Sequence, residues 1–213
     1  MGCDIHAYCE VKRKGKWVLM GDIFPYVYYD PSHPEDDYNT ATSDCVFVGR
    51  NYELFGILAG VRGSGDAFIP PRGVPNNASK EFKKIVDGWG SDGHTHHWYT
   101  LKELLEYDWF GNKTYSGYVS VYEYAEYKKD GRPSDWYDSK LKKCKVITNE
   151  EMDEVLKKHK KEKRMSDNDE FAITYITWKQ SHSNFCGDFT NSLSYMKLLG
   201  DPKDVRMVFF FDN

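Results

Sequence analysis

The first twelve positions of the chain alternate between two kinds of side chain. In an extended chain, small or apolar residues fall on one side and polar or ionisable residues on the other: Cys3, Ile5, Ala7, Cys9 and Val11 against Asp4, His6, Tyr8 and Glu10. Lys14-Gly15 has turn chemistry, and residues 16–20 read as a return strand. Residues 3–20 therefore predict a β-hairpin whose first strand has one apolar face and one face of polar and ionisable side chains.

Helix signals recur at five places further along. Each combines helical spacing with an N-cap or a glycine stop: Asn51 before 52–59, Ser79 before a helix ending at Gly88, Thr100 with Glu103 before a helix to about Tyr107, Thr148 with Glu151 before a helix to about Arg164, and 188–199 closed by Gly200. Residues 117–126 and 171–178 predict strands. The almost wholly apolar strand 205–211 predicts a strand covered on both faces, in the middle of the sheet.

Two stretches carry no stable period and predict long loops, at 21–48 and 128–143. We therefore expect a single α+β domain over residues 1–213. Its mixed, mainly antiparallel sheet is built from the hairpin, the 117–126 and 171–178 strands and the C-terminal strand, with helices packed chiefly on one face.

The composition and net charge limit the classes of partner that the chain is expected to bind. The 213 residues are 40% hydrophobic and 29% charged with a net charge of −4, so no basic field favours duplex nucleic acid or an anionic membrane. No apolar run approaches the roughly 18 residues that a membrane helix needs. The five cysteines form no C-x-x-C pair, which indicates reduced thiols and a cytoplasmic protein.

Imidazoles and a carboxylate provide the candidate chemistry. Asp4 and His6 share a strand face, and His94 and His96 lie in a histidine-rich stretch, 89–98, that predicts a loop leading to a helix N-terminus. Carboxylate and imidazole groups are ligands for first-row divalent metals. We expect these four residues to be catalytic and to bind a divalent metal such as Zn or Mn.

Cations and a third imidazole provide candidate substrate contacts. Arg50, Arg62, Arg72 and His97 are placed to bind a phosphate beside the metal. The first hypothesis is therefore metal-dependent hydrolysis of a nucleotide or other phosphoester. The second is a non-catalytic binder that sequesters a signalling nucleotide or occludes a host protein.

A structural alternative stands beside both hypotheses. In it, Asp4 and His6 hydrogen-bond each other and the returning C-terminal strand, with Asp212 or Arg206 nearby. Such contacts need no ligand.

Five segments together resemble a family of small proteins found largely in bacteriophages and prophages: MGCDIH, GRNYELFGILAGVR, PRGVP, GHTHHWYTLKELL and VRMVFFFDN. The resemblance covers both ends and the first half of the chain, whereas residues 112–165 carry no matching motif. It implies a phage-type accessory protein in the host-cell cytoplasm, acting on host defence or metabolism. It assigns no role to any residue.

A second resemblance concerns chemistry alone. The order D-x-H, Gly21-Asp22, GRNY and GHTH is similar to the metal motifs of calcineurin-like phosphoesterases, which favours phosphoester chemistry. Two departures count against kinship: the first strand turns into a hairpin, and Tyr52 stands where a catalytic histidine is expected.

Overall fold

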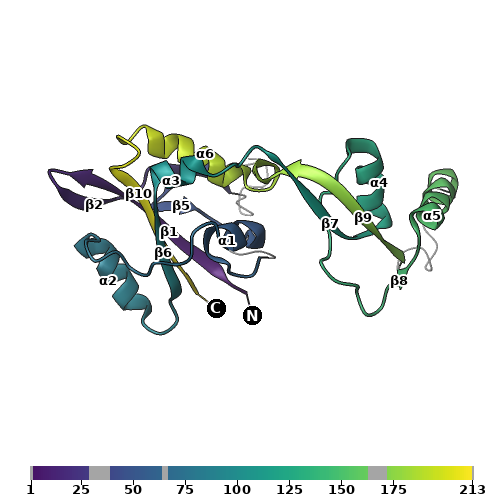
Figure 1. The fold of residues 1–213 in the computed structure, drawn as a ribbon, viewed down its shortest axis with the longest axis horizontal. Coiled ribbons are helices and arrows are strands. Elements are labelled where there is room, and N and C mark those ends of the chain that lie inside the picture. The colour runs from purple at the N-terminus through teal and green to yellow at the C-terminus, as the bar shows by residue number, and fades with distance from the viewer. Residues whose placement is uncertain (1, 29–38, 64–66, 163–171, 213) are drawn as a thin grey trace. The chain divides into compact units, whose positions relative to one another are not determined.

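The computed structural model of the chain describes residues 2–28, 39–63, 67–162 and 172–212. They divide into two compact units. The first unit comprises Met1–Trp109 and Phe185–Asn213, and the second comprises Phe110–Asn184. Figure 1 shows that each unit has its own strands and helices. The predicted α+β class is confirmed, and the strands are mainly antiparallel.

The first unit is built on an antiparallel sheet of strand order β2-β1-β10-β6, with β5 also paired to β1. The strands are β1 (Asp4–Arg13), β2 (Lys16–Met20), β5 (Cys45–Phe47), β6 (His94–Thr100) and β10 (Val205–Asp212). A separate two-stranded sheet joins β3 (Phe24–Tyr28) to β4 (Asn39–Ser43). The predicted hairpin is β1 with β2, and the C-terminal strand is central, as its apolar pattern predicts.

Both faces of this sheet are covered, which explains why β10 is apolar almost throughout. Phe209 and Phe211 belong to the main core, which also holds the alternating apolar residues of β1. Val208 and Phe210 belong to a smaller apolar cluster on the opposite face. Apolar side chains are buried on both faces of β10, which is favourable, so most of this strand lacks the alternating polar residues of a strand with one face in water.

Helices of the first unit begin where the sequence predicts. They are α1 (Tyr52–Ala59), α2 (Lys80–Trp89), α3 (Leu101–Glu106) and α6 (Gly187–Lys197). The side chain of Asn51 accepts a hydrogen bond from the Leu54 amide, and that of Ser79 accepts one from the Phe82 amide. Thr100 forms a capping box with Glu103. Residues of α1, α3 and α6 pack into the main core, whereas α2 packs on the other face. The helices therefore cover chiefly one face (Figure 1).

The second unit has a three-stranded sheet of order β7-β9-β8. Its elements are β7 (Asn112–Ser120), α4 (Val121–Asp130), β8 (Lys145–Val146), α5 (Asn149–Glu162), β9 (Ala172–Ser181) and a short 3-10 helix, His182–Asn184. One apolar cluster joins α4 and α5 to the inner face of β7 and β9, with Val119, Met152 and Trp178 at its centre. The predicted capping box of Thr148 with Glu151 is formed at the start of α5.

Four sequence predictions differ from the structure, two of them in the first unit. The predicted loop at 21–48 contains β3, β4 and β5; positions 29–38 lie outside the described residues. Within the histidine-rich stretch predicted as a loop, residues 94–98 belong to strand β6, which pairs with β10. A bulge conceals its alternation, because Thr95 has a φ of 50° and the register shifts opposite Phe209 and Phe211.

The predicted strand 117–126 ends at Ser120, which forms a capping box with Glu123 and starts α4 instead. Strands β7 and β9 pair with each other and with β8, so they form a sheet separate from that of the hairpin. A periodic pattern predicts that strands exist, whereas their partners depend on which surfaces meet. The predicted loop at 128–143 begins after α4; from Gly131 to Cys144, a stretch described throughout, the chain contains only an isolated bridge from Tyr137 to Tyr118.

Candidate functional site

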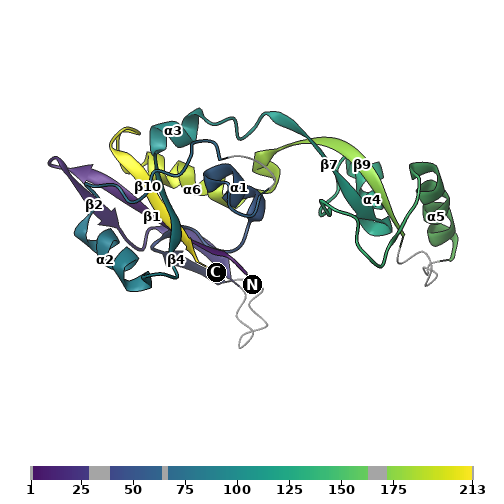
Figure 2. The same ribbon diagram turned by 60° about the horizontal axis from the view of Figure 1, so that its bottom comes forward.

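Asp4 and His6 lie at the beginning of β1, on the face opposite the main core. Cys3, Ile5 and Ala7 between and beside them are buried in that core. This is the division of faces that the alternating sequence predicts. In both views, β1 begins where β10 ends (Figures 1 and 2), and the register pairs Asp4 with Asp212. The site is therefore assembled from opposite ends of the sequence.

Asp4 holds the guanidinium of Arg50 in a bidentate contact. The distances are 2.6 Å from Nε to Oδ1 and 2.8 Å from Nη2 to Oδ2. The hydrogen bond from Arg50 lowers the pKa of Asp4 below its ordinary value. The Arg50 side chain nevertheless remains 54% exposed. A bidentate partner fixes the plane of the guanidinium, so Arg50 is an oriented cation that solvent and solutes can reach.

Gly2 permits this placement of Arg50. A Cβ built on Gly2 would lie 2.3 Å from Nη1 of Arg50 and 2.5 Å from its Cζ. The guanidinium therefore lies directly against the backbone of Gly2. A side chain at this position would push Arg50 away from Asp4.

His6 contacts Asp212, the next polar residue of the same cluster. Nε2 of His6 lies 3.2 Å from Oδ2 of Asp212, and Oδ1 of Asp212 accepts a hydrogen bond of 3.0 Å from the backbone amide of Asp4. The register of β1 with β10 causes both contacts. The contact with the Asp212 carboxylate fixes the orientation of the His6 ring.

An aromatic layer continues from His6 across the sheet. His6 stacks on Phe210 with ring centroids 5.0 Å apart, and His96 stacks on Phe210 at 5.4 Å. Because β10 lies between β1 and β6, the Phe210 ring stands between the two imidazoles. Trp89, at the end of α2, lies 4.2 Å from the His6 ring. The phenyl ring therefore prevents His6 and His96 from facing each other directly.

His94 has different neighbours. Its ring stacks on Phe211, a residue of the main core, with centroids 6.1 Å apart, and its Nδ1 lies 2.8 Å from Oγ1 of Thr95. Nε2 of His94 and Nε2 of His96 are buried and have no hydrogen-bond partner among the described residues. Burial lowers the pKa of His96, and the nearby His94 adds to this.

His97 is buried in the fold, whereas Arg72 is held at its surface by partners within the fold. His97 is fully buried, with Nε2 2.9 Å from the Ile69 carbonyl oxygen and Nδ1 3.2 Å from the backbone nitrogen of Arg72. Nε2–H donates and Nδ1 accepts, so the ring is neutral; burial lowers its pKa to about 4. The Arg72 side chain makes a bidentate contact with Glu103, at 2.9 and 3.1 Å, and lies 3.7 Å over the Trp98 ring. These groups connect β6 to α3 and to the preceding loop.

Arg62 lies beside Cys3 at the edge of the cluster. The cysteine thiol has a pKa above its ordinary value because burial raises it, although a hydrogen bond and the charge of Arg62 oppose the rise. Cys3 points into the main core. The structure thus brings together Asp4, His6, Arg50 and Asp212, which we call the terminal cluster, with Arg62 nearby.

The other predicted site residues lie elsewhere in the first unit. His96 is across Phe210, His94 is against Phe211, and His97 and Arg72 are engaged in packing contacts. No group of three or more His, Cys, Asp or Glu side chains with metal-binding geometry is present within the described part of the chain. Sequence reasoning placed Asp212 near this strand only in its structural alternative, and no sequence signal pointed to Trp89.

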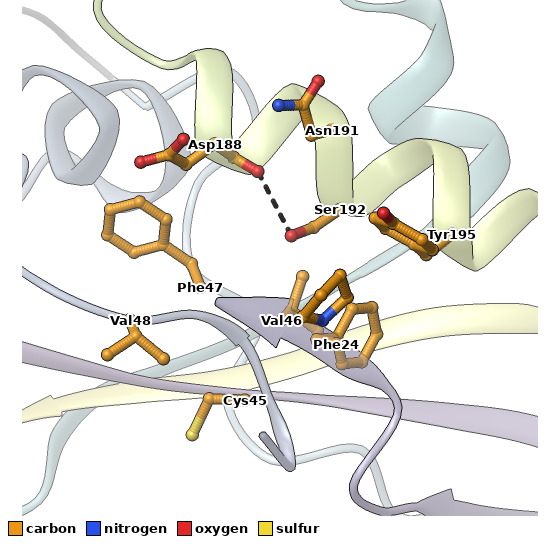
Figure 3. Close-up of a pocket in the computed structure, with 10 residues that line it drawn as sticks. Phe24, Cys45, Val46, Phe47, Val48, Asp188, Asn191, Ser192 and Tyr195 are labelled. Atoms are coloured by element: carbon orange, nitrogen blue, oxygen red, sulfur yellow. Dashed lines mark hydrogen bonds between the residues drawn. The ribbon is translucent and has the colours of Figure 1, made fainter. Parts of the chain in front are cut away.

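The first unit also contains a cavity of about 350 Å³, which is lined by residues outside the terminal cluster. Figure 3 shows its two walls: polar residues of α6 (Asp188, Asn191, Ser192 and Tyr195) face apolar residues of β3, β5 and the adjoining chain (Phe24, Val46, Phe47 and Val48). No arginine or lysine is among the described residues that line it. Apolar residues inside the predicted 21–48 loop were the only sequence signal for this cavity.

Comparisons of the chain with protein-family models, with curated proteins and with solved structures found no match. Across the described ranges, none of the helices has the length and apolar character that crossing a membrane requires.

Proposed function

We propose that the protein is a non-catalytic binder of a small phosphorylated ligand of the nucleotide class, held at the terminal cluster. The observation that carries this proposal is Arg50. Its guanidinium is oriented by Asp4 through two short hydrogen bonds, yet more than half of the side chain is exposed. Asp4 uses Nε and Nη2, Nη1 lies against Gly2, and the exposed part of the guanidinium is the part that binds a phosphate oxygen.

The surroundings support a nucleotide rather than a bare phosphate. The ring of His6, a member of the terminal cluster, is in contact with the ring of Trp89. Aromatic faces stack on bases with little regard to base identity. A ligand with a phosphate at Arg50 and a base against this ring pair uses both features.

Binding is favoured over hydrolysis because the groups that hydrolysis needs are dispersed. Arg72 and His97 are engaged with Glu103 and Ile69, and Phe210 stands between His6 and His96. A metal-activated water requires several ligands that converge on one ion.

The test is calorimetric titration with a panel of linear and cyclic nucleotides, followed by chromatography of each mixture. We expect saturable binding of at least one nucleotide, with no product. Arg50→Met should weaken binding by roughly 10- to 100-fold, as expected for one charged hydrogen-bonding group. Arg13→Met is the matched control, since Arg13 is an exposed arginine that contacts only the Leu199 carbonyl among the described partners. Absence of binding across the panel, or equal loss in both variants, refutes the proposal.

A metal-dependent phosphoester hydrolase is the second candidate, favoured by the buried Nε2 atoms of His94 and His96, which have no hydrogen-bond partner in the described part of the chain. An imidazole nitrogen of this kind suits a divalent metal such as Zn or Mn. Metal analysis of the purified protein and of a His94→Ala/His96→Ala variant tests it. Stoichiometric metal that the variant loses, together with product from the nucleotide panel, establishes the hydrolase in place of the binder.

The cellular role follows from the resemblance to phage proteins. We propose that the chain acts in the cytoplasm of a host cell, where it lowers the free concentration of a signalling nucleotide used in defence or metabolism. Cells that express it should contain less of the free nucleotide than cells that express Arg50→Met. If the concentration of the free nucleotide is unchanged but expression of the protein still alters host physiology, we would infer that the protein occludes a host protein instead.

A further inference from the structure

The sheet of the second unit has helices on one face only. α4 and α5 pack on the face to which Val119 and Trp178 belong. Successive side chains of a strand point to opposite faces, so the residues between these positions lie on the other side. We call this side the outer face, and it consists of three cross-strand pairs of β7 with β9: Thr114 with Lys179, Ser116 with Thr177, and Tyr118 with Tyr175. Five of these six residues are exposed, and Tyr118 is partly buried.

Three tyrosines form a row across the outer face. The rings of Tyr118 and Tyr175 have centroids 5.0 Å apart. On its other side, Tyr118 exchanges two backbone hydrogen bonds of 2.9 Å with Tyr137. Side chains of directly paired residues lie on the same face, so Tyr137 extends the row. Tyr175 and Tyr137 are 48% and 39% exposed, and the Tyr175 hydroxyl donates to Oγ of Ser116 at 2.8 Å, which fixes the ring.

The charge beside this tyrosine row is positive. Neither β7 nor β9 contains an aspartate or glutamate, and Lys179 is exposed on the outer face. The chain that follows Tyr137 carries a lysine run of four exposed residues, none of which forms an ion pair with a described residue: Lys140, Lys142, Lys143 and Lys145. The run returns to the sheet where Lys145 pairs in register with Ala172. Ala172 is three positions from Tyr175 on β9, which is about 10 Å along a strand.

The charges of the chain are divided unequally between the two units. Residues 110–184 contain 15 lysines and arginines against 13 aspartates and glutamates, whereas the rest of the chain contains 14 against 20. The net charge of −4 therefore belongs to the first unit, and the second unit is weakly basic. A polyanion is attracted to the unit that carries the tyrosine row.

We propose that the outer face binds single-stranded nucleic acid, with unpaired bases stacked on the tyrosine row and backbone phosphates against the lysine run. Exposed aromatic rings on an open sheet face stack on bases of any identity, whereas the bases of a duplex are already stacked on one another. The row crosses three neighbouring chain segments, about 10 Å, which is room for two or three bases. DNA and RNA share this chemistry. All of these residues belong to the second unit, so the proposal is independent of the terminal cluster.

The test is a fluorescence anisotropy titration of the full chain with labelled oligonucleotides of about fifteen thymidines or fifteen uridines at low salt. We expect saturable binding, and the ratio of the two dissociation constants distinguishes DNA from RNA. A duplex of the same length should bind more weakly. Absence of binding to both single strands, or tighter binding of the duplex, overturns the proposal.

Tyrosine variants test the stacking. Tyr175→Ala should weaken binding by roughly 5- to 50-fold, and Tyr137→Ala at the other end of the row should act in the same direction. Tyr122→Ala is the matched control, because Tyr122 is 56% exposed in the same unit but lies on α4. Circular dichroism checks that each variant is folded. An equal loss in Tyr122→Ala, or none in either row variant, contradicts the assignment of the row.

Charge variants test the phosphate contacts. Lys142→Gln/Lys143→Gln should weaken binding and reduce the slope of log affinity against log salt concentration by roughly 1. Lys157→Gln/Lys158→Gln on α5 is the control, since these lysines are equally exposed but lie on a helix of the other face. Arg50→Met should bind the oligonucleotides as the wild type does. An equal effect of the two lysine pairs, or loss of binding in Arg50→Met, places the nucleic acid elsewhere and refutes the proposal.

Discussion

Replacing Arg206 by methionine tests how strongly the first unit depends on one buried ion pair. Arg206 on β10 and Glu10 on β1 have side chains that are 2% and 0% exposed. Nε and Nη2 of Arg206 lie 2.7 and 2.6 Å from Oε2 of Glu10. The other carboxylate oxygen accepts a hydrogen bond of 2.7 Å from the backbone amide of Ser79, the N-cap of α2. The pair therefore connects two strands and a helix.

The size of the effect follows from what Arg206→Met leaves behind. Methionine fills much of the volume, but it leaves the Glu10 carboxylate buried with only the Ser79 amide as partner. Removal of one member of a buried ion pair costs about 3 to 5 kcal/mol, most of it the free energy of holding an unpaired charge away from water. A neutral pair should be tolerated, so Glu10→Gln/Arg206→Met should recover most of the loss.

Urea unfolding followed by circular dichroism measures this. We expect Arg206→Met to lower the unfolding midpoint with little change in the slope, and the double variant to unfold near the wild type. If Arg206→Met lowers the free energy of unfolding by less than about 1 kcal/mol, the reasoning is refuted, because the Glu10 charge is then accessible to water. A double variant as unstable as Arg206→Met assigns the loss instead to the other contacts of the guanidinium, which are its packing on Trp17 at 3.9 Å and its hydrogen bonds to Asn77 at 2.9 and 3.3 Å.

Three further predictions concern stability. A Cβ on Gly56 of α1 would lie 2.7 Å from Cα of Gly63, so Gly56→Ala should destabilise by about 1 to 3 kcal/mol. Gly88→Ala in α2, where a Cβ meets nothing within 4 Å, should stabilise by roughly 0.5 to 1 kcal/mol in the same urea assay; effects of equal sign contradict the packing argument. Burial lowers the pKa of His97 to about 4 from 6.5, so the unfolded chain takes up a proton first as the pH falls. The free energy of unfolding should therefore decrease as the pH falls from 6.5 to 4, and His97→Gln should lose that part of the pH dependence. If the wild type and His97→Gln have superimposable profiles of unfolding free energy against pH, His97 is not the source of this dependence.

Local signals were sufficient for most of the elements. The capping boxes at Thr100 and Thr148 depend on residues three positions apart, and both form as predicted. The box at Ser120 obeys the same rule, but the alternation of the preceding strand concealed it. The strand β6 was missed because the bulge at Thr95 interrupts the two-residue period on which strand prediction depends.

The terminal cluster could be predicted only in part. The alternation in β1 placed Asp4 and His6 on one face, opposite Cys3 and Ile5. Their partners, Arg50 and Asp212, lie 46 and 206 positions further on, and no local rule selects them. A prediction that imidazoles converge requires knowledge of which strands are neighbours and of what stands between them.

The sequence by itself determined which face of β1 is buried, where α1, α2, α3 and α5 start and that the C-terminal strand is central, because these depend on the periodicity of neighbouring side chains and on caps within one turn. Only the tertiary structure decided that β7 and β9 form a separate sheet, that Phe210 stands between His6 and His96, and that Asp4 orients Arg50. Strand partners and side-chain contacts across long sequence separations are selected by the packing of whole surfaces, and that information is spread over the entire chain.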